Sequence, residues 1–260
     1  MEVAVITGAS MGLGAEFARQ LAARRINLLL VARSADLLDQ LAEELHHRHG
    51  VKVRTLALDL SKAESAGHLA TFIETERLNP TWLVNNAGFG IVGAFQDMSA
   101  ERLHEMMMLN MVTLVNLTRA LLPALRLNVD ARIINVASTA AFQPVPFFNV
   151  YAASKTFVLN FSEALHDELR GTGVRVLALC PGPTPTKFHV AAGVDEKIFH
   201  QGQTAADVVR MGLVASDRNR AVLVCQRAWL IVLMRAVPRA IVRRAAGFVA
   251  RQFLSKMHRS

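Results

Sequence analysis

The stretch EVAVITGASMGLG, residues 2–14, decides the fold of this chain. Its first half is a short apolar run that is typical of a strand buried in a parallel sheet, and residues 15–25 place Phe17, Ala18 and Leu21 on one side of a helix. The glycines between them let a ligand approach the backbone closely, and a helix N-terminus offers free N–H groups and a positive dipole end. Together these features predict a dinucleotide site, although the Gly-x-x-x-Gly-x-Gly spacing differs from the commoner Gly-x-Gly-x-x-Gly.

Apolar runs of strand length alternate with helix-length segments along most of the chain. This alternation predicts an α/β fold with a doubly wound parallel sheet of the Rossmann type, in three layers. Besides residues 2–7, the runs are Asn27–Ala32, Val51–Leu58, Trp82–Asn85, Arg132–Ala137, Val174–Cys180 and Ala221–Cys225. A chain of 260 residues, of which 52% are hydrophobic, allows one or two domains, and the unbroken alternation favours one. We expect residues 1–226 to form this domain and residues 227–260 to be a helical extension of it.

Ser138, Tyr151 and Lys155 lie downstream of the glycine turn and indicate hydride transfer at an alcohol or carbonyl carbon. Tyr151 and Lys155 are four residues apart, so on a helix they share one face and the phenol can sit above the ammonium. A nearby cation favours the phenolate and moves the tyrosine pKa toward neutrality, where the phenol can act in acid-base catalysis. Taken alone, such a pair is more often two residues on a solvated helix face, and the glycine turn changes that balance.

Five motifs in a fixed order make the chain resemble the short-chain dehydrogenase/reductase family over residues 2–226. They are Thr7 to Gly14, Asp59-Leu60 after the third predicted strand, Asn85-Asn86-Ala87-Gly88 after the fourth, Ser138 with Tyr151 and Lys155, and the segment from Pro181 to Thr186. The resemblance implies an oxidoreductase that uses a nicotinamide cofactor. It also implies a homodimer or homotetramer that forms through the long helices predicted around residues 103–125 and 150–169.

The resemblance implies a role for each matching residue. Tyr151 would donate a proton to the substrate carbonyl or accept it in the oxidative direction, Lys155 would lower the tyrosine pKa and contact the nicotinamide ribose, and Ser138 would hold the substrate oxygen. Asn110 would position a water for proton relay to the lysine, and a satisfied core amide is its alternative role. The residues expected to contact the cofactor are Gly8, Ser10, Gly12, Leu13, Gly14, Arg33, Ser34, Asp59, Leu60, Asn86, Ala87, Gly88, Tyr151, Lys155, Pro181, Gly182 and Thr184.

The residues after the second predicted strand favour NADP(H) over NAD(H). A carboxylate there would bind the ribose 2′-OH of NAD and repel a 2′-phosphate, but the positions hold Arg33 and Ser34. The planar donor fork of an arginine and a serine hydroxyl suit a phosphate group. An ordinary exposed arginine is the alternative reading of Arg33. Met11 stands where many NADP-using relatives carry a basic residue, so we expect only modest discrimination against NADH.

The sequence indicates an apolar substrate. Phe142, Phe147 and Phe148 lie in the loop before Tyr151, which in the family flanks the substrate. They point to a large ketone or an acyl-type carbonyl compound, and core or subunit-contact positions are an equal alternative for the three rings. We also expect residues 188–199 to form a mobile lid over the site.

The C-terminal segment is strongly basic. The chain has a formal net charge of +8, and residues 218–260 contain ten Lys and Arg but no Asp or Glu. A helix over residues 238–254 places Ile241, Val242, Ala245, Phe248, Val249 and Phe253 on one face and Arg239, Arg243, Arg244 and Arg251 on the other. Such a helix packs on the domain or on a second subunit, or it lies on an anionic membrane surface. We expect no specific nucleic-acid partner, because there is no stacking platform and no DNA-binding motif. The apolar run at residues 228–234 is too short to span a bilayer.

The remaining features concern the cellular setting and the alternatives. The first strand begins so close to Met1 that no signal peptide fits, which predicts a cytoplasmic protein, or one peripheral at a membrane. Cys180 and Cys225 are expected to be core thiols, and the histidines lack ligand spacing, so we expect no metal. A non-catalytic NADP(H)-binding, membrane-surface or partner-binding protein is the alternative to an enzyme. An epimerase or dehydratase of the related extended family is disfavoured, because little room for a substrate domain follows Cys180.

Overall fold

A seven-stranded parallel sheet forms the centre of the protein, in the order β3-β2-β1-β4-β5-β6-β7. The computed structural model describes residues 1–185, 202–225, 237–238 and 240–248. The strands are β1 (Glu2–Thr7), β2 (Leu28–Ala32), β3 (Val53–Ala57), β4 (Asn79–Asn85), β5 (Ala131–Val136), β6 (Val174–Cys180) and β7 (Val222–Val224). All of the strands predicted from apolar runs are present, and they differ from the predicted ranges only at their ends.

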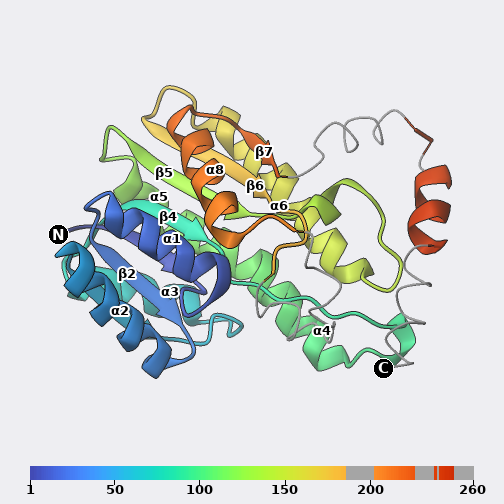
Figure 1. Ribbon diagram of the computed structural model, residues 1–260, viewed down its shortest axis with the longest axis horizontal. Helices are drawn as coiled ribbons and strands as arrows, with labels where there is room; N and C mark the ends of the chain where they lie inside the picture. Colours follow the sequence, from blue (N-terminus) through green and yellow to red (C-terminus); the bar gives the residue numbers. More distant parts are fainter. Residues whose placement is uncertain (186–201, 226–236, 239, 249–260) are drawn as a thin grey trace.

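Helices cover both faces of the sheet and complete the three predicted layers (Figure 1). One face carries α1 (Gly12–Ala23), α2 (Ala35–His49) and α8 (Ala205–Asp217). The other carries α3 (Ser65–Thr75), α5 (Thr113–Leu125) and α6 (Asn149–Glu168). Alternate residues of β1 divide between the two cores, with Ala4 and Ile6 in the first and Val3 and Val5 in the second. Because both faces of the sheet are buried, the strand reads as a continuous apolar run.

The direction of the strand order reverses between β1 and β4, and this reversal marks the expected ligand-binding crevice. β2 and β3 extend from β1 toward one edge, whereas β5, β6 and β7 extend from β4 toward the other. In open α/β sheets such a switch point leaves a crevice outside the carboxyl ends of the strands, where ligands bind. The glycine turn follows β1 and the Asn85-Asn86-Ala87-Gly88 motif follows β4, so both motifs lie at this crevice.

The helical segment before β5 is interrupted by a π-helical turn that contains Asn110. It runs from α4 (Ala100–Met107) through a π-helical turn, Met108–Val112, into α5. The whole segment is long and apolar enough to cross a membrane. However, Leu117, Leu121 and Leu125 are buried against the sheet, as in the core helix of a globular domain. The predicted helix around residues 103–125 is therefore present, with Asn110 in its irregular turn.

The structure describes part of the C-terminal extension. Residues 240–248 are helical, within the helix predicted over residues 238–254. Figure 1 shows this helix in orange-red at the opposite end of the molecule from β2 and α2. The predicted domain boundary at residues 226 and 227, the predicted lid at 188–199 and the apolar run at 228–234 lie outside the described residues.

Candidate active site

A cavity of about 950 Å³ opens at the carboxyl ends of the strands. It brings together most of the residues predicted to bind the cofactor or to act in catalysis. Those that line it are Gly8, Ser10, Gly12, Leu13, Arg33, Ser34, Asp59, Leu60, Asn86, Ala87, Gly88, Ser138, Tyr151, Lys155, Pro181, Gly182 and Thr184. The other two lie directly behind the lining, Gly14 against Gly8 and Asn110 against Gly88. Within the described part of the chain, no group of three or more His, Cys, Asp or Glu side chains could hold a metal.

The geometry of the glycine turn explains its spacing. Gly8 and Gly12 have φ angles of 63° and 59°, in the left-handed region that favours glycine. A Cβ atom on Gly14 would lie 2.2 Å from the carbonyl oxygen of Gly8, which is far inside van der Waals contact. The turn folds back on the first turn of α1, and only a residue without a side chain fits there.

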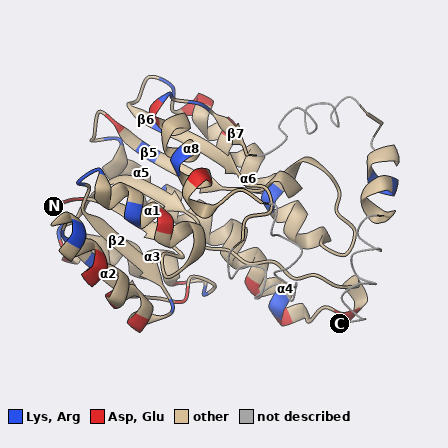
Figure 2. Cartoon of the chain, viewed as in Figure 1, with Lys and Arg blue, Asp and Glu red and all other residues tan. Residues whose placement is uncertain are grey.

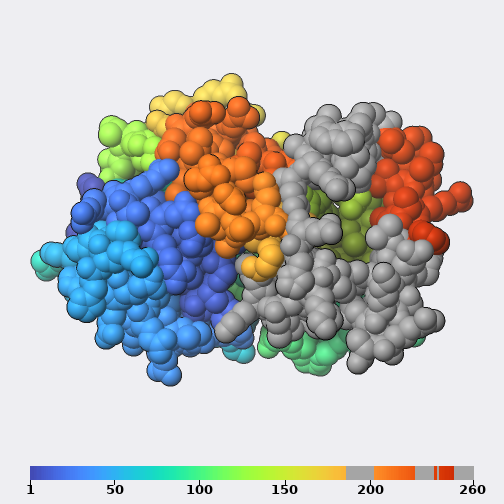
Figure 3. Space-filling view, in the orientation of Figure 1, coloured from blue at the N-terminus to red at the C-terminus, as the bar shows by residue number. Residues whose placement is uncertain are grey.

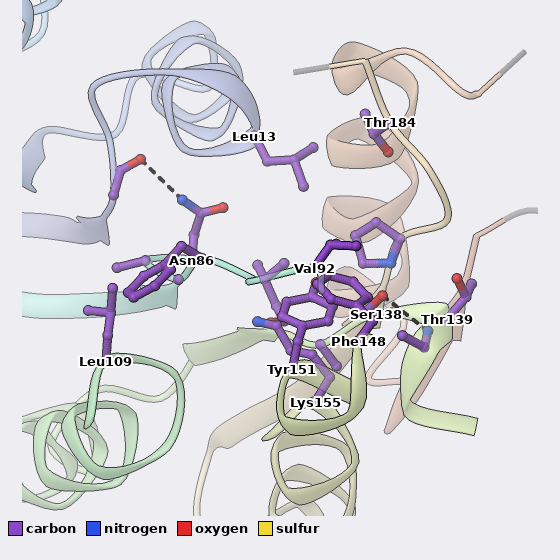
Figure 4. A pocket seen from close by; sticks show the side chains of 18 of the residues that line it. Leu13, Asn86, Val92, Leu109, Ser138, Thr139, Phe148, Tyr151, Lys155 and Thr184 are labelled. Carbon is purple, nitrogen blue, oxygen red and sulfur yellow. Dashed lines mark hydrogen bonds between the residues drawn. The ribbon is translucent and has the colours of Figure 1, made fainter. Parts of the chain in front are cut away.

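The motif after β4 braces this turn. The Asn86 side chain donates from Nδ2 to the carbonyl oxygens of Thr7 at 2.9 Å and Gly8 at 3.1 Å, and Figure 4 draws one of these two bonds. The Thr7 hydroxyl in turn accepts from the backbone N–H groups of Asn86 and Ala87, both at 3.0 Å. These contacts fix the turn across the switch point before any ligand arrives. Asn86 therefore stabilises the conformation of the glycine turn, in addition to lining the cavity.

The turn and α1 fit a pyrophosphate-bearing cofactor. In the described chain no side chain caps the N-terminus of α1, where Met11 occupies the cap position. The first N–H groups of a helix have no partner within the helix, so they are available to an anion in the cavity. The glycines remove the side chains that would otherwise fill this space. In this part of the cavity, the groups available to bind an anion are therefore mainly backbone N–H groups.

Arg33, Ser34 and Asp59 lie at the far end of the same half. Arg33 and Ser34 are exposed, and Ser34 caps α2 without a side-chain capping hydrogen bond to the described backbone. Asp59 accepts from the backbone N–H and the hydroxyl of Ser61, at 3.0 and 2.8 Å. Burial opposes ionisation of Asp59, but these two hydrogen bonds and the nearby charge of Arg33 hold its pKa below the usual value. A guanidinium, a hydroxyl and the N-terminus of α2 thus lie together at the wall of this cavity.

Tyr151 and Lys155 share one face of α6, as their spacing predicts. Both are buried, with 7% and 5% of their surface exposed. The Lys155 Nζ lies 5.7 Å from the centre of the Tyr151 ring and donates to the carbonyl oxygen of Val136 at 2.8 Å. Figure 4 shows both side chains at the base of the cavity. The pair is therefore not on a solvated helix face.

The pKa of Tyr151 shifts in the direction opposite to the sequence-based expectation. Burial raises it to about 12, and a hydrogen bond with Ser138 acts against this rise. Burial also lowers the pKa of Lys155 to about 8. Desolvation disfavours the charged form of both groups, and the lysine ammonium is held by Val136 rather than by the phenol. The phenol is consequently protonated at neutral pH, which is the form that donates a proton.

Ser138 lies two residues after the end of β5 and hydrogen-bonds the Tyr151 side chain. Its backbone is extended and its hydroxyl accepts from the backbone N–H of Ala140 at 3.1 Å, which caps a short 3-10 turn, Thr139–Phe142 (Figure 4). The capping hydrogen bond fixes the position of the Ser138 hydroxyl. This hydroxyl also hydrogen-bonds the Tyr151 phenol, so the two side-chain oxygens are adjacent. A carbonyl oxygen bound there meets both groups.

Asn110 is a fully satisfied buried amide. Its Nδ2 donates to the carbonyl oxygen of Phe89 at 3.0 Å and to the Ser154 hydroxyl at 3.1 Å, while its Oδ1 accepts from the Phe89 N–H at 3.2 Å. These bonds hold the loop after β4 in place from the π-helical turn. The structure therefore gives Asn110 a positioning role, and its role in a proton relay stays a prediction.

Sequence reasoning missed the contact between Phe148 and Tyr151. The two rings are stacked, with centroids 4.2 Å apart and planes at 20°. A Cβ atom on Gly90 would lie 2.6 Å from the Phe148 ring, so the second glycine after Asn86 makes room for this stack. The sequence places Phe148 near the site, but only the fold shows that its ring lies on Tyr151.

The other half of the cavity is apolar. Its lining includes Phe89 and Val92 after β4, Val145 and Phe147 before α6, and side chains from residues 237–246. Of the three phenylalanines expected to flank a substrate, Phe147 and Phe148 line the cavity, whereas Phe142 packs against the core, which was the alternative. Sequence analysis did not assign the C-terminal residues to the site, because no local motif connects them to the sheet.

A glycine turn at the switch point of a parallel sheet, next to a buried tyrosine and lysine, defines a nicotinamide-dependent oxidoreductase of the α/β class. The family model described as short chain dehydrogenase matches residues 2–197. The chain therefore belongs to the short-chain dehydrogenase/reductase family, and it is an oxidoreductase of that family.

Similar proteins include reductases. The chain is 37% identical to sulfoacetaldehyde reductase 2 of Chromohalobacter salexigens, over 72% of this chain and 74% of the relative. It is 32% identical to the very-long-chain 3-oxoacyl-CoA reductase of Homo sapiens, over 72% of this chain and 61% of the relative.

Solved structures resemble the fold along almost the whole chain. A short-chain dehydrogenase from Sphingobium yanoikuyae in complex with NADPH has a TM-score of 0.81 and 31% identity, and covers 92% of this chain and 98% of its own. The bulky-bulky ketone specific alcohol dehydrogenase from Comamonas testosteroni has a TM-score of 0.78 and 28% identity, covering 92% of this chain and 96% of its own. These likenesses support a nicotinamide cofactor and carbonyl reduction.

Proposed function

We propose that this protein reduces the carbonyl group of an apolar ketone or acyl-type compound with NADPH, and that Tyr151 is the proton donor. One observation carries the proposal: Ser138, Tyr151 and Lys155 line the same cavity as the glycine turn and a set of apolar side chains. A cofactor held by the glycine turn and a substrate held by the apolar walls would meet at these three side chains.

The residues of the chain divide the chemistry between them. A bound nicotinamide supplies the hydride. Ser138 holds the substrate oxygen beside the Tyr151 phenol, which is protonated at neutral pH and donates its proton as the oxygen gains negative charge. The Lys155 ammonium stabilises the phenolate that this donation leaves behind. In the oxidative direction the Tyr151 phenolate would accept the proton as the base.

Arg33 and Ser34 support the choice of NADPH. Both are exposed beside the N-terminus of α2 at the end of β2, where a carboxylate would mark a preference for NAD. Arg33 can donate two hydrogen bonds to a phosphate, and the helix N-terminus adds a favourable dipole. Relatives solved with NADPH are consistent with this choice.

The walls of the cavity favour a bulky apolar substrate. The apolar lining residues that share the cavity with Ser138 and Tyr151 include Phe89, Val92, Val145 and Phe147. Covering their apolar surface stabilises a bound hydrocarbon group more than a small polar group. Among the relatives, the Comamonas enzyme is specific for bulky ketones and the human enzyme is a reductase of very-long-chain 3-oxoacyl-CoA. Sulfoacetaldehyde, the substrate named for the Chromohalobacter relative, is small and anionic, and the apolar walls suit it less well.

The test is the loss of NADPH absorbance with purified protein and a panel of ketones, aldehydes, steroid-like diketones and long-chain 3-oxoacyl thioesters, with NADH in parallel. We expect turnover with bulky apolar members and a preference for NADPH. Tight NADPH binding without turnover of any member would contradict the proposal and favour a non-catalytic binding protein.

A further inference from the structure

The C-terminal helix contributes a wall to the active-site cavity. Val237 and the helical residues Ile241, Val242, Ala245 and Ala246 line it together with the loop before α6. Ile241 keeps 58% of its surface exposed, although it lines the same cavity as Tyr151. In the space-filling view the orange-red helix borders a hollow with yellow-green atoms at its base (Figure 3). An exposed apolar face directed into a reaction cavity is a surface for a ligand to cover.

We propose that this helix face is the subsite for the hydrocarbon part of the carbonyl substrate, with Ile241 as its principal contact; this inference rests on the proposed function. Positions 241 and 245 are one helical turn apart, as are 242 and 246, so the four side chains form one continuous strip. The strip is about 7 Å long at 1.5 Å rise per residue. It matches an alkyl chain or a ring system and exceeds a single methyl group.

The charges around the substrate half support hydrocarbon over an anionic group. Among the described lining residues outside the cofactor half, Lys155 aside, the charged side chains are Arg102 and Glu105. They form an ion pair with each other, and the Arg102 guanidinium also lies over the Phe89 ring, 4.6 Å from its centre. Figure 2 shows opposite charges side by side on α4. Among these described residues, an anionic substrate group such as a sulfonate would find no cation that lacks an acidic partner.

The same helix offers a matched control. Phe248 is as exposed as Ile241, at 60%, but it does not line the cavity. Arg243 and Arg244 are also exposed and absent from the lining. A helix whose role is to lie on an anionic membrane would use Phe248 and these arginines at least as much as Ile241. The subsite requires Ile241 and not Phe248.

The experiment compares Ile241→Ser and Phe248→Ser in the full chain, using NADPH and a series of unbranched methyl ketones of increasing length. For Ile241→Ser we expect kcat/KM to fall roughly tenfold with the longest ketone and less than about twofold with the shortest, because only a long chain reaches the strip. For Phe248→Ser we expect the full series to match the unmodified protein. Affinity for NADPH should be unchanged in both.

Three results would overturn the subsite. They are an equal loss of kcat/KM at every chain length, an equal effect of the two substitutions on the long ketones, and no effect of Ile241→Ser. Binding to phosphatidylglycerol vesicles is measured for the same proteins. Loss of vesicle binding in both variants with unchanged ketone kinetics would make a membrane the occupant of this face and would also overturn the proposal.

A binding measurement separates this inference from the proposed function. Calorimetry measures the longest ketone binding to the NADPH-saturated Tyr151→Phe protein, with and without Ile241→Ser, and needs no turnover. If the unmodified protein reduces no ketone but Ile241→Ser still weakens binding about tenfold, the subsite stands and the proposed reaction fails. If turnover occurs and binding is insensitive to Ile241→Ser, the subsite fails and the reaction stands.

Discussion

The two halves of the cavity are built in different ways. The cofactor half consists of backbone: left-handed glycines, an open helix N-terminus, and a turn that Asn86 holds by two hydrogen bonds. The substrate half consists of side chains from loops far apart in sequence, including the loop before α6 and the C-terminal helix. Backbone geometry tolerates almost no substitution, whereas an apolar wall accepts many residues of similar volume. The comparison teaches that one fold can fix its cofactor while leaving its substrate open to change.

The largest effect is expected at the junction of the halves. Tyr151→Phe removes the proton donor and keeps the ring that stacks on Phe148, so reduction should slow about a thousandfold. NADPH affinity should change less than about twofold, since the contact removed acts on the substrate oxygen. Single-turnover kinetics and NADPH fluorescence titration measure the two quantities. Retention of activity would remove Tyr151 from the mechanism.

The next effect tests whether the cofactor half depends on its backbone. Gly14→Ala puts a methyl group 2.2 Å from the Gly8 carbonyl oxygen, so the turn must open. Loss of one or two charge-assisted contacts to the pyrophosphate should weaken NADPH about a hundredfold. Gly67→Ala in α3 is the control, because its new Cβ meets no atom within 4 Å and alanine favours a helix by up to about 1 kcal/mol. Equal NADPH affinity in both variants would refute the backbone account.

A smaller effect concerns the selectivity of the cofactor half. Arg33→Ala should weaken NADPH by about 2 kcal/mol, roughly thirtyfold, which is the loss of charge-assisted hydrogen bonds to the 2′-phosphate. NADH affinity should stay within about twofold. Titration of both nucleotides against both proteins gives the comparison. Parallel losses would show that Arg33 shapes the site without recognising the phosphate.

The smallest effect is the pH dependence of the reaction. Burial lowers the pKa of Lys155 to about 8, so its ammonium is charged below that pH and neutral above it. The rate of reduction should therefore fall about tenfold between about pH 7 and pH 9, while Tyr151 stays protonated. The pH profile of kcat/KM, with Lys155→Met as reference, checks this. A profile that is flat across this interval would show that the rate does not depend on the charge of Lys155.

Sequence reasoning predicted the fold and the family, and most of the residues that it assigned to the cofactor line one cavity. Strand β1, the turn after it and the motif after β4 each carry a local pattern that backbone sterics impose, and the switch point brings them together. Cys180 and Cys225 are buried without a disulfide, as expected, and pack in different cores. Cofactor contacts, oligomeric state and cytoplasmic location stay predictions.

The substrate half was less predictable because tertiary packing creates it. The stack of Phe148 on Tyr151 depends on the room that Gly90 leaves, and nothing in the local sequence pairs these residues. The amphipathic pattern of the C-terminal helix was visible, but the pattern alone does not say what its apolar face meets. The predicted direction of the Tyr151 pKa shift was wrong because that shift also depends on tertiary packing. Burial raises the pKa, and Lys155 donates its hydrogen bond to Val136.

The most direct test of the central claim follows a deuterium label from NADPH that carries deuterium at both C4 positions of its dihydronicotinamide. Purified protein is incubated with this cofactor and a long-chain methyl ketone, and the product is analysed by mass spectrometry. We predict an alcohol with the label on its carbinol carbon from the unmodified protein, and almost none from Tyr151→Phe. Unlabelled product, or equal labelled product from both proteins, would contradict a hydride transfer that depends on Tyr151.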